Sequence, residues 1–329
     1  MRRRDFITLC GGVAAAIPLT SRSQQPEQIR HIGVLMNLSA DDPEGKGRAD
    51  AFLEGLGELG WTDGRNLRVD YRWGGGDTEL FRRYAEELVT LAPDVILATG
   101  TPVVEALQRV TRTMPIVFVT VIDPVGAGFV ESLAHPGGNI TGFTLFEYGM
   151  SGKWVELLKE IMPRVTRAAV LRDSAVGSGT GQLAAIQSVA PAFGLELIPI
   201  GVRDPSEIER SLAAFARGPN DSMIVTASTL ALVHRQPIIA LAARHRLPAI
   251  YPDRTFVIGG GLISYGPNRV DPYRRAAGYI DRILKGEKPS GLPVQAPIKH
   301  ELVINLKVAR GLGLTMPPAV LALANEVIE

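Results

Sequence analysis

Short apolar runs recur along the chain, and most are followed by a stretch whose apolar residues lie three or four positions apart. The first pattern is typical of buried strands and the second of amphipathic helices, such as the one that presents Leu80, Tyr84, Leu88 and Leu91. The predicted strands are His31–Met36, Asn66–Tyr71, Asp94–Ala98, Pro115–Val121, Ala168–Leu171, Leu195–Ile200, Met223–Ala227, Pro248–Tyr251 and Gly261–Tyr265. Strands that alternate with helices favour parallel sheets covered on both faces.

This alternation occurs twice. The first set of strands and helices ends near Val121, and a second set begins at Ala168. Between them, His135–Thr144 carries three glycines and a proline without a strong helix pattern, so we interpret it as the end of one half and the crossing into the next. The sequence therefore predicts an α/β fold of two Rossmann-like lobes, and 329 residues are enough to give each lobe its own core.

The stretch Gly261–Leu284 contains the clearest strand-to-helix transition. After the strand, Gly266-Pro267-Asn268 is predicted to break it, with Asp271 as the N-cap of a helix and Pro272 at its first position. One helix face then collects Tyr273, Ala276, Ala277, Ile280, Ile283 and Leu284. In open α/β sheets, ligands bind in the crevice at the carboxyl ends of strands, where this polar transition would lie.

The last third of the chain also resembles a known family. The segments SYGPN (264–268), DPYRRAAGYIDRILKGEKPSGLPVQAP (271–297), KHELVINLK (299–307) and ARGLGLTMPP (309–318) are similar to ABC transporter substrate-binding proteins with the type I periplasmic-binding fold. The resemblance extends over essentially the whole mature chain. It implies a ligand cleft with a hinge and three crossings between the lobes, so that lobe one spans 24–142 plus about 267–290, and lobe two spans 143–266 plus about 291–329. Members of this family include binders of aromatic amino acids.

The N-terminus has the pattern of an export signal. Arg3 and Arg4 precede Phe6-Ile7 in an arrangement similar to a twin-arginine signal, and the apolar run Ile7–Leu19 is too short to span a bilayer. Residues 1–23 are therefore expected to be removed in the periplasm, with cleavage before Gln24. The alternative is an amphipathic N-terminal helix of a cytosolic protein.

Charge and cysteine content exclude several classes. The formal net charge is +1, and residues 24–329 carry 31 basic and 33 acidic side chains, so nucleic acid is not expected as a partner. The single cysteine, Cys10, permits no disulfide within the chain, and the five histidines lack zinc-binding spacing. We expect no metal and no cofactor, and a mature chain that is a monomer outside the membrane.

Polar residues at the predicted strand ends are the candidate ligand-binding residues. They are Asn37, Ser39, Thr99, Gly100, Thr101, Asp123, Ser174, Ser228, Tyr251 and Tyr265, with Asp173 and Ser264 beside them. Thr99-Gly100-Thr101 at a helix N-terminus suits a carboxylate, Asp123 an amine, and Tyr251 or Tyr265 an aromatic body. This combination favours an amino acid or an aromatic compound as the ligand.

Each candidate also has a structural explanation. Thr101 could serve only as a helix cap and Asp123 as a cap or turn residue, while Tyr265 could belong to the core of its lobe. Ser174 and Ser228 could simply end strands, and Asp173 could pair with Arg172 at the surface. The recurrence of polar residues at successive strand ends is therefore a stronger signal than any one of them.

Motifs typical of enzymes are absent. The glycines of Val176–Gly181, interpreted as a loop, have G-x-G-x-G spacing instead of the dinucleotide fingerprint, and no phosphate loop or nucleophile elbow occurs. The favoured hypothesis is a non-enzymatic periplasmic component of an ABC importer that captures a small molecule by hinge closure and delivers it to an inner-membrane permease. The alternatives are a ligand sensor of the same fold that signals to a membrane receptor and a periplasmic enzyme.

Overall fold

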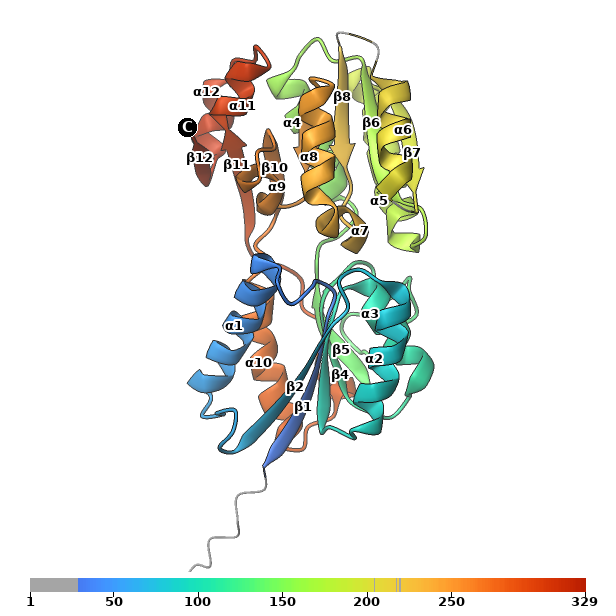
Figure 1. Ribbon diagram of the computed structural model, residues 1–329, viewed down its shortest axis with the longest axis vertical. Helices are drawn as coiled ribbons and strands as arrows, with labels where there is room; N and C mark the ends of the chain where they lie inside the picture. Colours follow the sequence, from blue (N-terminus) through green and yellow to red (C-terminus); the bar gives the residue numbers. More distant parts are fainter. Residues whose placement is uncertain (1–28, 204, 217, 219) are drawn as a thin grey trace, which may run out of the picture.

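Two separate sheets organise the chain (Figure 1). A computed structural model describes residues 29–329 except 204, 217 and 219; the predicted export signal at residues 1–23 lies outside the described residues. The first sheet has the order β2-β1-β3-β4-β5, with all neighbours parallel. Its strands are β1 (Arg30–Met36), β2 (Leu67–Trp73), β3 (Val95–Thr99), β4 (Ile116–Val121) and β5 (Ile140–Thr144).

The second sheet has the order β12-β11-β10-β9-β8-β6-β7. Its strands are β6 (Arg167–Asp173), β7 (Glu196–Val202), β8 (Asp221–Val225), β9 (Ala249–Tyr251), β10 (Ile263–Pro267), β11 (His300–Asn305) and β12 (Glu326–Ile328). The fold class is thus confirmed as two α/β lobes. Two strands at one edge of this sheet depart from the expected parallel arrangement, because β11 runs antiparallel to β10 and β12 is parallel to β11.

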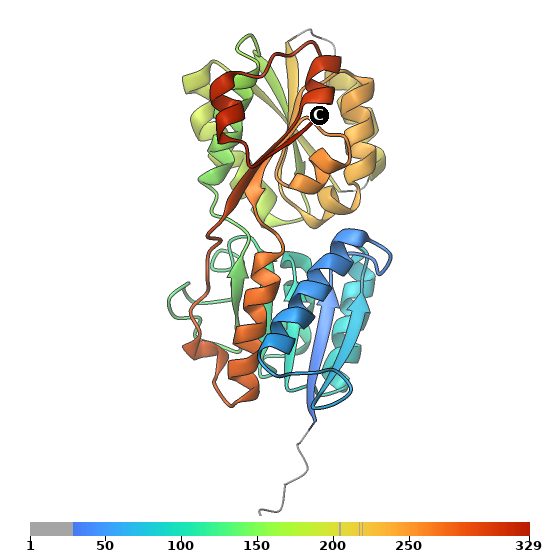
Figure 2. The same ribbon diagram turned by 90° about the vertical axis from the view of Figure 1, so that its left-hand side faces the viewer.

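Helices cover the sheets of both lobes (Figures 1 and 2). With the first sheet lie α1 (Pro43–Glu58), α2 (Thr78–Thr90), α3 (Thr101–Val110) and α10 (Asp271–Leu284). With the second lie α4 (Met150–Ile161), α5 (Gly177–Val189), α6 (Pro205–Phe215), α7 (Thr229–Val233), α8 (Arg235–Arg244), α9 (Arg254–Ile258), α11 (Leu306–Gly311) and α12 (Pro318–Leu323). We call these two bodies lobe one and lobe two.

The chain returns to lobe one late in the sequence. The six apolar residues predicted for one face of α10 are all buried, as expected, and they pack with β1 and β3 in the core of lobe one. After α10 the chain follows lobe one as far as Gln295, which pairs with Phe143 at the sheet edge, and then enters lobe two as β11. Figure 2 shows these segments passing between the lobes. The boundaries of the lobes stay predictions.

Several local predictions were wrong. Strand β10 continues through Gly266 to Pro267. Helix α10 starts at Asp271 itself with Val270 as its N-cap, and the side chain of Asn268 just before it accepts the N–H groups of Val270 (3.0 Å) and Asp271 (2.9 Å).

Two glycine-rich stretches also differ from the prediction. Residues Gly177–Gly181 form the first turns of α5 instead of a loop. Only a glycine fits at 179 in this helix, because a Cβ there would lie 2.1 Å from the Asp173 carbonyl oxygen. The stretch His135–Thr144 contains the buried strand β5, which its glycines obscured.

Close packing of α1 on α10 gives a first testable prediction. A Cβ on Gly55 would lie 2.7 Å from the Arg274 carbonyl oxygen and 3.0 Å from Ala277 Cβ, so Gly55→Ala should lower the free energy of unfolding by about 2 kcal/mol. The matched control is Gly47→Ala in the same helix, where nothing lies within 4 Å. It should raise stability by up to about 1 kcal/mol. Urea unfolding of both variants measures this, and equal stabilities would contradict the close packing.

Candidate functional site

A polar pocket lies between the lobes, at the carboxyl ends of strands from both sheets. It has a volume of 30 Å³, and we call it the inner pocket; lobe one lines it with Asn37, Gly100 and Thr101, and lobe two with Asp173 and Ser228. A second space of 280 Å³, the outer chamber, shares Pro102, Asp173, Val176 and Thr229 with the inner pocket, so the two are adjacent. The outer chamber is also lined by Phe81, Glu105, Ala106, Arg109 and Leu230.

The lobe-one wall is the junction between β3 and α3. Gly100 is the N-cap of α3 and has φ of +83°, which a glycine adopts without strain. Thr101, expected to be this N-cap, is instead the first helical residue. In the described part of the chain no side chain caps α3. Pro102 has no N–H and the Val104 N–H bonds to the Gly100 carbonyl at 3.3 Å, so the N–H groups of Thr101 and Val103 are the ones left without an intrahelical acceptor, and Thr101 lines the inner pocket.

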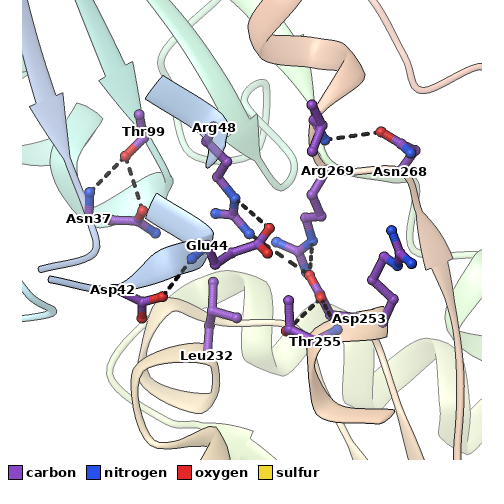
Figure 3. Close-up of polar contacts among 12 residues, drawn as sticks. Asn37, Asp42, Glu44, Arg48, Thr99, Leu232, Asp253, Thr255, Asn268 and Arg269 are labelled. Carbon is purple, nitrogen blue, oxygen red and sulfur yellow. Dashed lines mark hydrogen bonds and ion pairs between the residues drawn. The ribbon is translucent and has the colours of Figure 1, made fainter. Parts of the chain in front are cut away.

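Thr99 holds Asn37 at the edge of this wall (Figure 3). The Thr99 Oγ1 accepts the Asn37 N–H at 2.7 Å and donates to Asn37 Oδ1 at 3.1 Å. Asn37 Nδ2 then donates to Thr229 Oγ1 of lobe two at 3.0 Å. Thr99 therefore acts on the pocket through Asn37, and Asn37 contacts both lobes.

The lobe-two wall carries a buried carboxylate. Asp173 ends β6, is 7% exposed, and accepts the Ala175 N–H at 2.9 Å. Burial raises the pKa of Asp173 above the ordinary value. Burial also raises the pKa of Glu105 on α3, and the charge of Asp173 contributes in the same direction although Arg109 opposes it. The carboxylates of Glu105 and Asp173, on opposite lobes, therefore repel each other across the outer chamber. A cation between them would reduce this repulsion.

Direct contacts hold the lobes together. Arg235 of α8 donates two hydrogen bonds to Asp42, at 2.8 and 2.9 Å, and Asp42 is the N-cap of α1. Leu38, which follows β1, is fully buried in a core cluster of lobe two. The structure thus has its lobes in contact around the pocket.

The structure brings together only some of the predicted ligand-binding residues. Asn37, Gly100, Thr101 and Ser228 line the inner pocket with Asp173. Ser228 also caps α7, since its Oγ accepts the Ala231 N–H at 3.0 Å.

The remaining candidates lie elsewhere. Asp123, with φ of +49°, accepts the Gly126 N–H at 2.8 Å and lines a separate cavity of 160 Å³ with Tyr148. Tyr251 is 1% exposed and stacks on Phe256, and the hydroxyl of Ser174 donates to the Val202 carbonyl at 3.2 Å. Tyr265 packs on the lobe-two core beside buried Ser264, and half-buried Ser39 does not line the inner pocket.

Comparison with known proteins settles the family. Residues 31–328 match the family model described as ABC transporter substrate binding protein. The chain belongs to this family. It is 26% identical over 264 residues to the tyrosine-binding protein of Clostridioides difficile (strain R20291), covering 80% of this chain and 75% of that protein.

Solved structures agree with the assignment. A crystal structure of an ABC domain from Streptococcus pneumoniae in complex with L-Trp is 27% identical, with a TM-score of 0.85, covering 91% of this chain and 99% of that one. A conserved domain protein from Vibrio cholerae is 28% identical, with a TM-score of 0.85 over 91% of this chain and all of that one.

The sequence of this substrate-binding protein did not reveal three residues of the pocket. Arg269 directly follows the predicted strand break Gly266-Pro267-Asn268, Thr229 follows a predicted strand end by two residues, and Glu105 of the outer chamber is one helical turn beyond Thr101. The i,i+4 spacing of Thr101 and Glu105 could have indicated a shared face.

Neither a membrane span nor a metal site emerges from the described ranges. No helix among them is long and apolar enough to cross a bilayer. In the same residues, no group of three or more histidine, cysteine, aspartate and glutamate side chains could hold a metal ion.

Proposed function

We propose that this substrate-binding protein captures an amino acid between its lobes for an ABC importer. The observation that carries the proposal is the junction of the two spaces at Asp173. The carboxylate of an amino-acid ligand fits the inner pocket against Gly100 and Thr101. The ammonium group of the same ligand then lies near the Asp173 carboxylate. The volume of 30 Å³ suits such a small polar group, whereas the outer chamber of 280 Å³ accepts the side chain.

The relatives favour an aromatic amino acid. One is named a tyrosine-binding protein and another is a complex with L-Trp. In the outer chamber, Phe81, Ala106 and Leu230 provide apolar surface and Glu105 and Arg109 provide polar groups, a mixture suited to an aromatic side chain with a polar edge.

The role in transport follows from closure of the lobes. A ligand that contacts Thr101 of lobe one and Asp173 of lobe two has more contacts in the closed state, and its differential affinity therefore favours closure. The closed monomer would dock on an inner-membrane permease and release its ligand unchanged, with no catalytic step. Export to the periplasm by residues 1–23 through the twin-arginine pathway completes the proposal.

A thermal-shift screen of residues 24–329 tests the function. The panel contains the common amino acids, aromatic acids, sugars and nucleosides. L-tyrosine or L-tryptophan at about 100 times Kd should raise Tm by roughly 5 °C, because a ligand that binds only the folded state stabilises it by mass action. A shift with sugars alone, or with nucleosides alone, would contradict the amino-acid assignment and leave the fold unaffected.

A further inference from the structure

Four charged side chains are clustered at the crossing between the lobes, next to the inner pocket (Figure 3). Glu44 and Arg48 belong to α1 of lobe one, Asp253 is the N-cap of α9 in lobe two, and Arg269 lies on the segment that joins β10 to α10. Arg48 is 0% exposed, Asp253 1% and Arg269 8%. Charges so deeply buried are costly unless they are paired.

The pairing attaches Arg269 to lobe two. Its Nε lies 2.5 Å from Asp253 Oδ2, and Asp253 Oδ1 is fixed by the N–H and hydroxyl of Thr255 at 2.8 and 2.7 Å. Arg48 instead donates to Glu44 of lobe one at 3.0 Å, and its Nη2 is 4.0 Å from Asp253. Asp253 is thus shared by arginines from two parts of the chain.

The outer end of Arg269 lacks an acceptor. Within residues 29–329 as described, no hydrogen bond is found for its terminal nitrogens or for Nε, whose contact with Asp253 is an ion pair, and the small exposed part of the side chain lines the inner pocket with Gly100 and Thr101. The buried Nη1 and Nη2 of Arg48 on α1 also lack hydrogen-bond partners, as does Asp253 Oδ2. Hydrogen-bond donors therefore outnumber acceptors in the cluster around Arg269, and the N–H of Thr101, the first residue of uncapped α3, adds a donor on the wall of the inner pocket.

We propose that Arg269 is a specificity-determining residue that selects a carboxylate on the ligand. The guanidinium donates to the carboxylate from one side of the inner pocket, and the first turn of α3 donates from the other. Because Asp253 of lobe two holds Nε of Arg269, the carboxylate links α3 of lobe one to lobe two. The inference rests on the proposed function, in which the ligand binds between the lobes, and it adds the residue that distinguishes a charged ligand carboxylate from an uncharged group.

The test compares a carboxylate with its uncharged amide. Calorimetry gives Kd for L-tyrosine, L-tyrosinamide and 3-(4-hydroxyphenyl)propionate with wild-type protein, Arg269→Gln and Arg269→Lys. Arg269→Gln should weaken both carboxylates by about 100-fold and change the amide by less than about 3-fold, so that discrimination between acid and amide is lost. Arg269→Lys should keep part of that discrimination, because lysine keeps the positive charge but cannot donate two parallel hydrogen bonds to a carboxylate as a guanidinium does.

A matched control is Arg235→Gln, which removes another partly buried interlobe arginine that does not line the pocket. It should weaken the acid and the amide by equal factors. The proposal would be overturned if Arg269→Gln also weakened the acid and the amide by equal factors, or if it bound both with wild-type affinity. Thermal unfolding of each variant identifies a folding defect. If the wild-type protein binds the propionate and no amino acid, the proposed function is refuted. The inference on Arg269 still holds in that case, provided that Arg269→Gln abolishes binding of the propionate. No binding of any carboxylate by wild-type protein would overturn both.

Discussion

Asp173→Asn is expected to weaken binding of an amino acid by about 100-fold, because truncating a buried charge partner typically costs 2–5 kcal/mol. Asp173 is the buried carboxylate shared by the inner pocket and the outer chamber, and it is the group placed to accept the ammonium. The substitution keeps the size of the side chain and an oxygen that can accept the Ala175 N–H. Calorimetric titration with the amino acid that gives the largest thermal shift measures the effect.

The matched control is Asp123→Asn, which separates two assignments of the amine site. The strand-end pattern assigned the amine to Asp123, but the structure places this residue in a different cavity, hydrogen-bonded to Gly126. There, burial first and then the charge of Asp123 raise the pKa of Tyr148 to about 12. Asp123→Asn should change Kd by less than about 3-fold. If Asp123→Asn abolishes binding and Asp173→Asn does not, the ammonium assignment is wrong.

Asp253→Ala is expected to lower the free energy of unfolding by about 4 kcal/mol at pH 7, since it leaves the charge of Arg269 buried without its partner. Burial alone would raise the pKa of Asp253, but the charges of Arg269 and Arg48 hold it below its usual value. A carboxylate with a lowered folded pKa stabilises the protein above its unfolded pKa, about 3.9, and this contribution is lost as the pH falls through the folded pKa. Denaturant unfolding at neutral and acidic pH measures both effects.

Asp253→Asn distinguishes the charge from the helix cap. The amide oxygen can still accept the Thr255 N–H, so this variant removes the charge and keeps the cap. It should retain about 1 kcal/mol of the stability lost in Asp253→Ala. A loss below about 1 kcal/mol for both variants at pH 7 would show that Arg269 and Arg48 do not depend on Asp253.

The fold could be predicted because its main signals are local. Tyr273, Ile280 and Leu284 repeat at helical spacing, and that pattern alone predicts that they are buried, whereas their place in lobe one was implied by the family resemblance. The antiparallel direction of β11 could not be predicted from the sequence, since it depends on the path that the chain takes from lobe one to lobe two after Gln295. Similarly, the close approach of Gly179 to the Asp173 carbonyl, which explains a glycine within α5, is a tertiary contact that the spacing of the glycines does not reveal.

The candidate site was predictable in position and less so in detail. The strand-end rule selected Asn37, Gly100 and Thr101, which do line the inner pocket, because parallel strands present their carboxyl ends at one edge. It cannot tell which way a side chain turns after the strand, so Asp123 and Asp173 were equivalent in the sequence. Arg269 could not be found, since its significance depends on Asp253, 16 positions away in the chain but adjacent in space.

A crystal structure of the complex with the amino acid of largest thermal shift tests the central claim most directly. Our account predicts ligand density between the lobes, with the carboxylate against Gly100, Thr101 and Arg269, the ammonium within hydrogen-bond distance of Asp173, and the side chain in the outer chamber. Density in the cavity beside Asp123, or a ligand in the cleft with its carboxylate directed away from Arg269, would contradict it.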